Sequence, residues 1–475
     1  MKLYTLIIFC SLVDKSIGIS DWDVFATKTT YHWATGRTIN PFFADVDYSF
    51  LKGNYECKAV HVNMVLRHGA RWPTDSNMEH IEELANKIKE NKTSSLFTEL
   101  DNWANRYDLQ NDGKLVQEGM VEQEFIGRNT WMRFQTLFEM YGNKYVKFVS
   151  SSKGRCIQST QSFYNGFYKT MDNKPIFAYE KNNKLMRFYD DCDRYETDVE
   201  DNEENFKELR TFEKSRDFQN VIKSVEGRLG LDAGTLSVDD VYQIHNLCSY
   251  EKYIYNETTW CNLLTDEERQ VMEYSSDLEN YYESSYGHPF NAKIACPLLD
   301  NMLTTMEISG DKSRDFDSIP QDNANGYLAA KIYEGHSGTM LPLMTKLGLF
   351  NDSEPLKSSN REKMKNRKFR TSHITPFSSN IAFVVYSCDD KLSSNHDREM
   401  MVKLFVNELP VTIPACNNEV CTLQSVLDYF KDIRGDKCDL EKLCEIKPVS
   451  EASRHIPVTF LYLIVLLLIS YISFK

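Results

Sequence analysis

Short apolar runs divide the chain into candidate strands. Residues 58–67, 146–149 and 381–387 are each rich in aliphatic side chains and are flanked by polar segments, which is typical of strands buried in a sheet. Residues 326–333 form a fourth such run. Gly69 and Pro73 follow the first run closely and predict that the backbone turns at the carboxyl end of that strand.

Helical spacing of apolar residues predicts the elements between the first strands. Ile81, Leu84 and Ile88 recur three and four positions apart within a region, about 76–140, that we expect to be helical. A second helix is expected from Ser159 to about Gly166, with Ser159 or Thr160 near its N-terminal cap.

The later part of the chain changes character twice. Residues 175–320 are acidic and lysine-rich with helical spacing, and 190–208 are dense in carboxylates, which indicates a solvated face or loop. A helix is expected over 339–347. We expect 389–403 to form an exposed hairpin or loop before the apolar residues 404–406.

Apolar runs also stand at both ends of the chain. Residues 1–18 read as a secretory signal, with Lys2 before an apolar run and small residues at 16–18. Residues 456–474 form an apolar tail long enough to span a bilayer. We expect this tail to be either a signal for a glycosylphosphatidylinositol anchor or a single membrane span, and the near absence of residues beyond it favours the lipid anchor.

Composition and charge narrow the class of protein. The 475 residues are 41% hydrophobic and 26% charged, as in a globular protein, and the formal net charge of −14 argues against a nucleic-acid partner. The twelve cysteines, eleven without Cys10 of the signal, indicate an oxidising compartment. Sequons at Asn91, Asn256 and Asn351 agree with secretion and predict glycosylation. No Cys-x-x-Cys pair occurs, so we expect no metal site.

The candidate chemistry lies in the turn after the first strand. Arg67 and Arg71 offer planar forks of donors that suit phosphate oxygens. His68 lies between these two cations, which favour its neutral form and leave a ring nitrogen free to attack phosphorus. All three residues are expected at the carboxyl end of a strand, where open α/β sheets bind their ligands.

The spacing Arg-His-Gly-x-Arg-x-Pro at 67–73 resembles the signature of the histidine acid phosphatases. Further segments resemble the same family in the same order, and two of them, 260–265 and 273–278, resemble its multiple inositol polyphosphate phosphatase branch. The other matching segments are 150–156, 335–343 and 376–383.

The resemblance implies an α/β fold. The expected core has three layers, with a mixed sheet flanked by helices, and it is formed by residues 19–170 and 323–449. The resemblance further implies an α-helical cap, residues 171–322, inserted over the active cleft.

The resemblance also implies a reaction. His68 would be the nucleophile of a phosphohistidine mechanism that needs no cofactor, and His336 the second catalytic histidine. Arg67, Arg71 and Arg155 would bind the substrate phosphate, with Lys153 as the alternative to Arg155. The implied substrates are inositol polyphosphates, inositol hexakisphosphate and lower, with 2,3-bisphosphoglycerate as a further candidate.

Disulfide pairs are likewise implied only by the family pattern. They are Cys57–Cys388, Cys248–Cys261 and Cys416–Cys421. The pairing of four more cysteines stays open: Cys192, Cys296, Cys438 and Cys444. Cys156 is expected to be the free thiol.

The proton donor is missing from its usual place. The family carries aspartate directly after the second histidine, or glutamate two positions after it, where this chain has Ser337 and Gly338. Glu334 is a weak candidate, because on a strand it shares a face with His336. The alternative is a weakened relative that binds phosphorylated ligands or a protein partner. The cap should also supply cations for further phosphates, and Lys181, Lys184 and Arg187 form the nearest dense group.

Overall fold

The computed structural model describes residues 24–36, 49–52, 55–93, 97–142, 144–316, 326–390 and 398–446. The predicted signal sequence and the apolar C-terminal tail both lie outside these ranges. Among the described residues, no helix combines the length and the apolar character that crossing a membrane requires.

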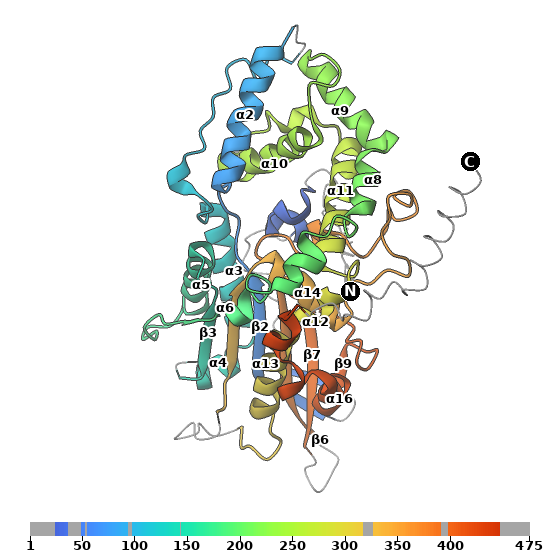
Figure 1. The fold of residues 1–475 in the computed structure, drawn as a ribbon. Coiled ribbons are helices and arrows are strands. Elements are labelled where there is room, and N and C mark those ends of the chain that lie inside the picture. The colour runs from blue at the N-terminus through green and yellow to red at the C-terminus, as the bar shows by residue number, and fades with distance from the viewer. Residues whose placement is uncertain are drawn as a thin grey trace, which may run out of the picture.

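One mixed sheet forms the centre of the described structure, in the strand order β4-β3-β5-β2-β6-β7-β8 (Figure 1). Its three longer parallel strands are β3 (Val146–Ser150), β5 (Ala330–Gly335) and β2 (Tyr55–Arg67), so the carboxyl ends of these strands meet at one edge, and the short β4 pairs parallel with β3. Antiparallel to β2 runs β6 (Asn380–Asp390), followed by β7 (Arg398–Val406). The short strands are β1 (Ser49–Lys52), β4 (Glu180–Lys181), β8 (Leu409–Val411) and β9 (Val420–Thr422).

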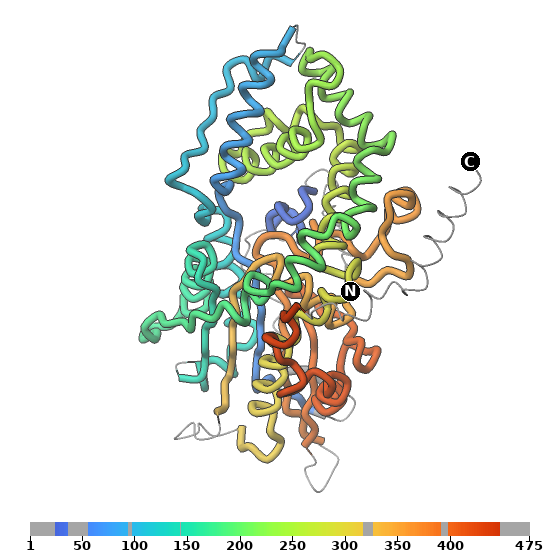
Figure 2. Tube along the Cα trace, in the orientation of Figure 1, coloured from blue at the N-terminus to red at the C-terminus, as the bar shows by residue number. Residues whose placement is uncertain are grey.

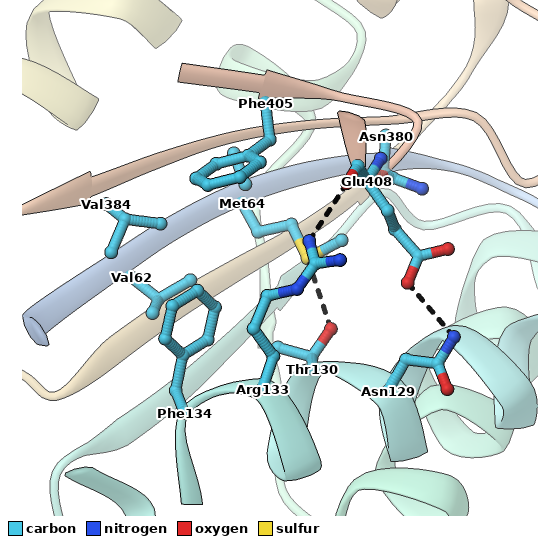
Figure 3. A pocket seen from close by; sticks show the side chains of 11 residues that line it. Val62, Met64, Asn129, Thr130, Arg133, Phe134, Asn380, Val384, Phe405 and Glu408 are labelled. Atoms are coloured by element: carbon cyan, nitrogen blue, oxygen red, sulfur yellow. Dashed lines mark hydrogen bonds between the residues drawn. The ribbon is translucent and has the colours of Figure 1, made fainter. Parts of the chain in front are cut away.

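Helices cover both faces of this sheet. Val62 and Met64 of β2 lie beside Asn129 and Arg133 of α3 (Gln117–Arg133), as Figure 3 shows. Asn63 points the other way and donates a hydrogen bond to the Met302 carbonyl of α13 (Cys296–Ser309) at 2.9 Å. Successive side chains of a strand face opposite sides, so the core has three layers. The predicted fold class is confirmed.

The remaining core helices pack beside these two. They are α4 (Gln135–Tyr141), α5 (Gly154–Phe167), α14 (Ser337–Leu347) and α16 (Leu423–Tyr429). Short helices complete the described chain: α1 (Tyr31–Thr35), α6 (Asn183–Met186), α7 (Asp193–Tyr195), α12 (Pro289–Ile294), α15 (Thr371–Ile374) and α17 (Leu440–Cys444).

A group of helices stands beyond the carboxyl edge of the parallel strands (Figures 1 and 2). Its members are α2 (Asp75–Asn91), α8 (Lys207–Glu213), α9 (Arg216–Leu229), α10 (Val238–Tyr255) and α11 (Asp266–Ser284). Two helices do not follow the expected division into core and cap. Helix α2, which belongs to the expected core, packs against α10 of the cap, and α13, which belongs to the expected cap, packs against β2 of the core. The boundaries at 171 and 322 stay a prediction.

Several expected elements begin elsewhere than predicted. Helix α5 begins at Gly154 rather than near Ser159, because the Ser159 hydroxyl accepts a hydrogen bond from the Gly69 N–H and so does not cap a helix. The helical region 76–140 is interrupted between α2 and α3. Of the exposed hairpin or loop expected at 389–403, the hairpin pairing is present, since β7 begins at Arg398 and pairs antiparallel with β6, but residues 400–402 are buried rather than exposed.

Five disulfides fasten the described chain. The three pairs implied by the family pattern are present: Cys57–Cys388, Cys248–Cys261 and Cys416–Cys421. The four open cysteines form Cys192–Cys444 and Cys296–Cys438. Cys156 is free and buried, as expected. Five disulfides are typical of a protein that folds in an oxidising compartment, secreted or lumenal.

A buried ion-pair network joins α11 to the segment before α15. Asp277 is fully buried and pairs with Arg367, whose side chain is 6% exposed. Its other oxygen accepts hydrogen bonds from the N–H and the hydroxyl of Thr371, at 2.9 and 2.6 Å. Arg370 pairs with Glu273 of the same helix at 2.8 Å. These contacts fix α11 against the chain that leads into β6.

Asp277→Ala tests this network. The substitution removes the carboxylate that Arg367 hydrogen-bonds and leaves it only Glu273, at 3.6 Å, so we expect the free energy of unfolding to fall by about 3 kcal/mol. Equilibrium unfolding in urea measures the change. Glu441→Ala is the control, because the pair Lys184–Glu441 is 82% and 84% exposed and should contribute less than about 1 kcal/mol. Equal midpoints for the two variants would contradict a structural role for the network.

Candidate active site

The predicted site residues come from three distant segments and meet at the carboxyl edge of the parallel strands. β2 ends at Arg67 and β5 at Gly335, and the next residues are His68 and His336. The His68 N–H donates to the Gly335 carbonyl at 3.0 Å, which joins the two strand ends directly. Arg155 lies in the first turn of α5, just beyond β3.

Gly69 lets the turn after β2 approach helix α3. A Cβ atom at Gly69 would lie 2.5 Å from the Gly119 carbonyl oxygen, a distance that no side chain tolerates. The Gly69 N–H donates to the Ser159 hydroxyl of α5 at 3.0 Å. The turn that carries His68 and Arg71 is therefore clamped between two helices, and glycine is required at this position for steric reasons.

His68 is buried and electrically neutral. Its Nδ1 donates to the carbonyl of Gly69 at 2.9 Å, which leaves the lone pair on Nε2. Burial lowers the pKa of His68 well below its usual value, and the charges of Arg155 and Arg67 lower it further. The ring therefore stays in its nucleophilic form in mildly acidic solution.

Backbone carbonyls hold Arg67. Its Nη1 donates to the carbonyls of Thr27 and Thr375, the latter at 2.7 Å, and its guanidinium lies 4.5 Å from the centre of the Phe377 ring. Burial, with the nearby charge of Arg71, lowers the pKa of Arg67 to about 9, so it remains a cation at neutral pH.

His336, the residue after β5, is hydrogen-bonded to Arg155. Arg155 Nη2 lies 3.4 Å from His336 Nδ1, and because arginine only donates, Nδ1 is the acceptor. Nε2 then carries the proton and donates to the Ser151 hydroxyl at 3.0 Å. The ring centres of His336 and His68 are 5.3 Å apart. Burial and Arg155 lower the pKa of His336 well below its usual value.

Two more cations lie near this cluster. Arg187, one of the three expected from the cap segment, interacts electrostatically with His336 and Arg155. Lys184 instead pairs with Glu441, and Lys181 is exposed on β4. Lys28 interacts with Arg71, and burial lowers its pKa to about 8.

Sequence reasoning missed Lys28. Residues 19–50 show no period from which its position could be predicted. Its place depends on a contact with a distant helix, where the Ser249 hydroxyl donates to the Lys28 carbonyl at 2.8 Å.

Glu334 lies beneath the site. Its side chain is buried, and its Oε1 accepts from the amide of Gln123, which also donates to the Arg67 carbonyl at 2.8 Å. Burial raises the pKa of Glu334 well above its usual value. A neutral carboxyl group at this position supports the turn through Gln123.

A separate small cavity lies between α3 and the sheet (Figure 3). The Asn129 amide donates there to Glu408 at 3.1 Å, and Arg133 donates to the Glu408 carbonyl at 3.0 Å. None of the predicted catalytic or phosphate-binding residues lines it, so it is not the candidate site. Within the described ranges, no group of three or more His, Cys, Asp or Glu side chains is arranged to hold a metal ion.

Solved structures share this fold. The crystal structure of the Bifidobacterium longum multiple inositol polyphosphate phosphatase in complex with inositol hexasulfate superimposes with a TM-score of 0.67, at 17% identity over 89% of this chain and 99% of the other. A phytase from D. castellii superimposes with a TM-score of 0.66, at 17% identity, over 91% and 88% of the two chains.

Sequence comparison gives the family. Multiple inositol polyphosphate phosphatase 1 of Gallus gallus is 31% identical over 90% of this chain and 93% of its own length. The Homo sapiens protein of the same name is 26% identical, over 94% and 93%. The sequence model of the histidine phosphatase superfamily (branch 2) matches residues 59–407. The chain belongs to branch 2 of the histidine phosphatase superfamily.

Proposed function

We propose that this protein is a metal-independent phosphomonoesterase that hydrolyses inositol polyphosphates, inositol hexakisphosphate and lower, through a phosphohistidine on His68. One observation carries the proposal. A neutral imidazole with a free Nε2 lone pair lies among the guanidinium groups of Arg67, Arg71 and Arg155, which form no ion pair with a carboxylate among the described residues. 2,3-Bisphosphoglycerate is a further candidate substrate.

Each residue has a distinct part in the first step. Arg67, Arg71 and Arg155 bind the oxygens of the scissile phosphate and stabilise the charge that builds up on them. His336 donates to the same oxygens once substrate displaces its bond to Ser151. His68 Nε2 attacks phosphorus in line with the ester bond, and water later hydrolyses the phosphohistidine.

The cations of the site and the names of the relatives both support inositol polyphosphates as the substrate class. Lys28 and Arg187 are further cations beside the scissile phosphate, and each also has a carboxylate neighbour, Glu279 for Lys28 and Asp190 for Arg187. Additional phosphates on one small ring would interact with these two cations. The curated relatives are named as inositol polyphosphate phosphatases, which supports the same class.

A second function is a phosphate-ligand binder with little catalysis. Ser337 and Gly338 favour it, because neither can act as the carboxylic acid that the family carries after its second histidine. General acid catalysis contributes about 10²- to 10⁴-fold, so its loss would leave a slow enzyme.

The exposed sequons support passage through the secretory pathway. Asn91, Asn256 and Asn351 all lie on the surface, and we propose that they carry glycans. We further propose that the predicted signal directs the chain into this pathway and that the tail at 456–474 gives a lipid-anchored protein at a cell surface or lumenal membrane.

Phosphate release tests the proposed activity. The natural protein should release phosphate from inositol hexakisphosphate, and His68→Ala should lower kcat/KM by about 10⁴-fold or more, because the nucleophile is lost. His80→Ala, an exposed histidine of α2, is the control and should be unchanged. If the natural protein binds inositol hexakisphosphate in calorimetry but releases no phosphate, the binding function replaces the enzymatic one.

Membrane release tests the anchor. Treatment of intact cells with a phosphatidylinositol-specific phospholipase should move the protein into the medium, because it cleaves a lipid anchor but not a peptide. Immunoblots of medium and membranes measure the release. Retention on the cells after treatment would support a peptide span instead.

A further inference from the structure

The segment before α7 is fixed against the start of α14. The hydroxyl of Thr339, in the first turn of α14, donates to the Met186 carbonyl. At the other end of the segment, Cys192 forms its disulfide with Cys444. Because His336 is the N-terminal cap of α14, these two ties hold residues 187–191 beside the second catalytic histidine.

The ring of Tyr189 occupies the space next to Gly338. A Cβ atom at Gly338 would lie 3.0 Å from Cε1 and Cζ of Tyr189 and 3.4 Å from its hydroxyl oxygen. Position 338 is where the family resemblance implies a glutamate. In this chain a phenol stands where that side chain would begin, and a glutamate at 338 would have to displace it.

The Tyr189 hydroxyl belongs to the charged cluster of the site. It is hydrogen-bonded to Arg187, which also pairs with Asp190, and it interacts electrostatically with Arg155. Arginine only donates, so the phenol oxygen accepts and its own hydrogen remains available. Burial, with Asp190 nearby, raises the pKa of Tyr189 above its usual range, so the hydroxyl is protonated at neutral pH.

We propose that Tyr189 is the proton donor for the leaving alcohol, in place of the missing carboxylic acid. This inference rests on the proposed function, because it concerns one step of that reaction. Tyr189 is half-buried, whereas Glu334 is fully buried.

One proton moves in each of the two steps of the reaction. His68 Nε2 forms a bond to phosphorus while the P–O ester bond breaks, and the leaving oxygen takes the phenol proton. An alkoxide is a stronger base than a phenolate, so this transfer is favourable, and Arg187 and Arg155 stabilise the phenolate. Water then attacks phosphorus, the N–P bond breaks, and the phenolate takes the proton of the water.

One carboxyl group is the rival donor. Glu279 of α11 interacts with Lys28, which in turn lies near Arg71 and Arg67. Glu279 is exposed to solvent, but the protein atoms around its carboxyl group remove part of its hydration and raise its pKa, so it is also able to carry a proton. We place the donor at Tyr189, because its ring contacts the position that follows His336 by two residues.

Tyr189→Phe tests the inference, because it removes the hydroxyl and keeps the ring over Gly338. We expect kcat/KM for inositol hexakisphosphate to fall about 10²-fold or more, and kcat/KM for p-nitrophenyl phosphate to change less than about threefold, since its leaving group needs little protonation. Across a series of aryl phosphates, the dependence of rate on leaving-group pKa should steepen. Tyr179→Phe, on a tyrosine that is 37% exposed, is the matched control and should match the natural protein throughout.

The same assay separates the possible failures. If Tyr189→Phe lowers kcat/KM equally for both substrates, or for neither, Tyr189 is not the proton donor, and the proposed activity of the natural protein is unaffected by that result. If Glu279→Gln lowers kcat/KM only for inositol hexakisphosphate and Tyr189→Phe changes neither substrate, the donor is Glu279. If the natural protein hydrolyses neither substrate, the proposed function fails together with the inference.

Discussion

Mutual repulsion among buried cations is the constraint on which the site depends. The charge of Arg71 lowers the pKa values of the buried Arg67 and of Arg155, and all three guanidinium groups lower the pKa of His68. The described fold offsets this cost with neutral acceptors rather than carboxylates, such as the carbonyls of Thr27 and Thr375. Carboxylates would neutralise the guanidinium groups and compete with phosphate.

The same constraint accounts for the state of the two histidines. Cations on several sides make an imidazolium unfavourable, so both rings are neutral. One hydrogen bond orients His68, and two orient His336. A neutral nucleophile surrounded by positive charge is complementary to a phosphate dianion and to the transition state formed from it.

Sequence reasoning predicted the parts that depend on local pattern. The strand ending at Arg67, the turn at Gly69 and the strand before His336 follow from apolar runs and turn residues, and the α/β fold was correct. Helix α5 was misplaced because Ser159 looks like a cap until its contact with Gly69 is known. Lys28 and Tyr189 could not be found, since each reaches the site through contacts between distant segments. The pairs Cys192–Cys444 and Cys296–Cys438 were open for the same reason.

Trapping the covalent intermediate tests the central claim most directly. The natural protein is mixed with a ³²P-labelled phosphomonoester, quenched within milliseconds in base, digested and sequenced by mass spectrometry. The mechanism predicts a base-stable, acid-labile phosphate on the peptide that contains His68, with none in His68→Ala. Turnover without any phosphorylated histidine, or with the label on another residue, would contradict it.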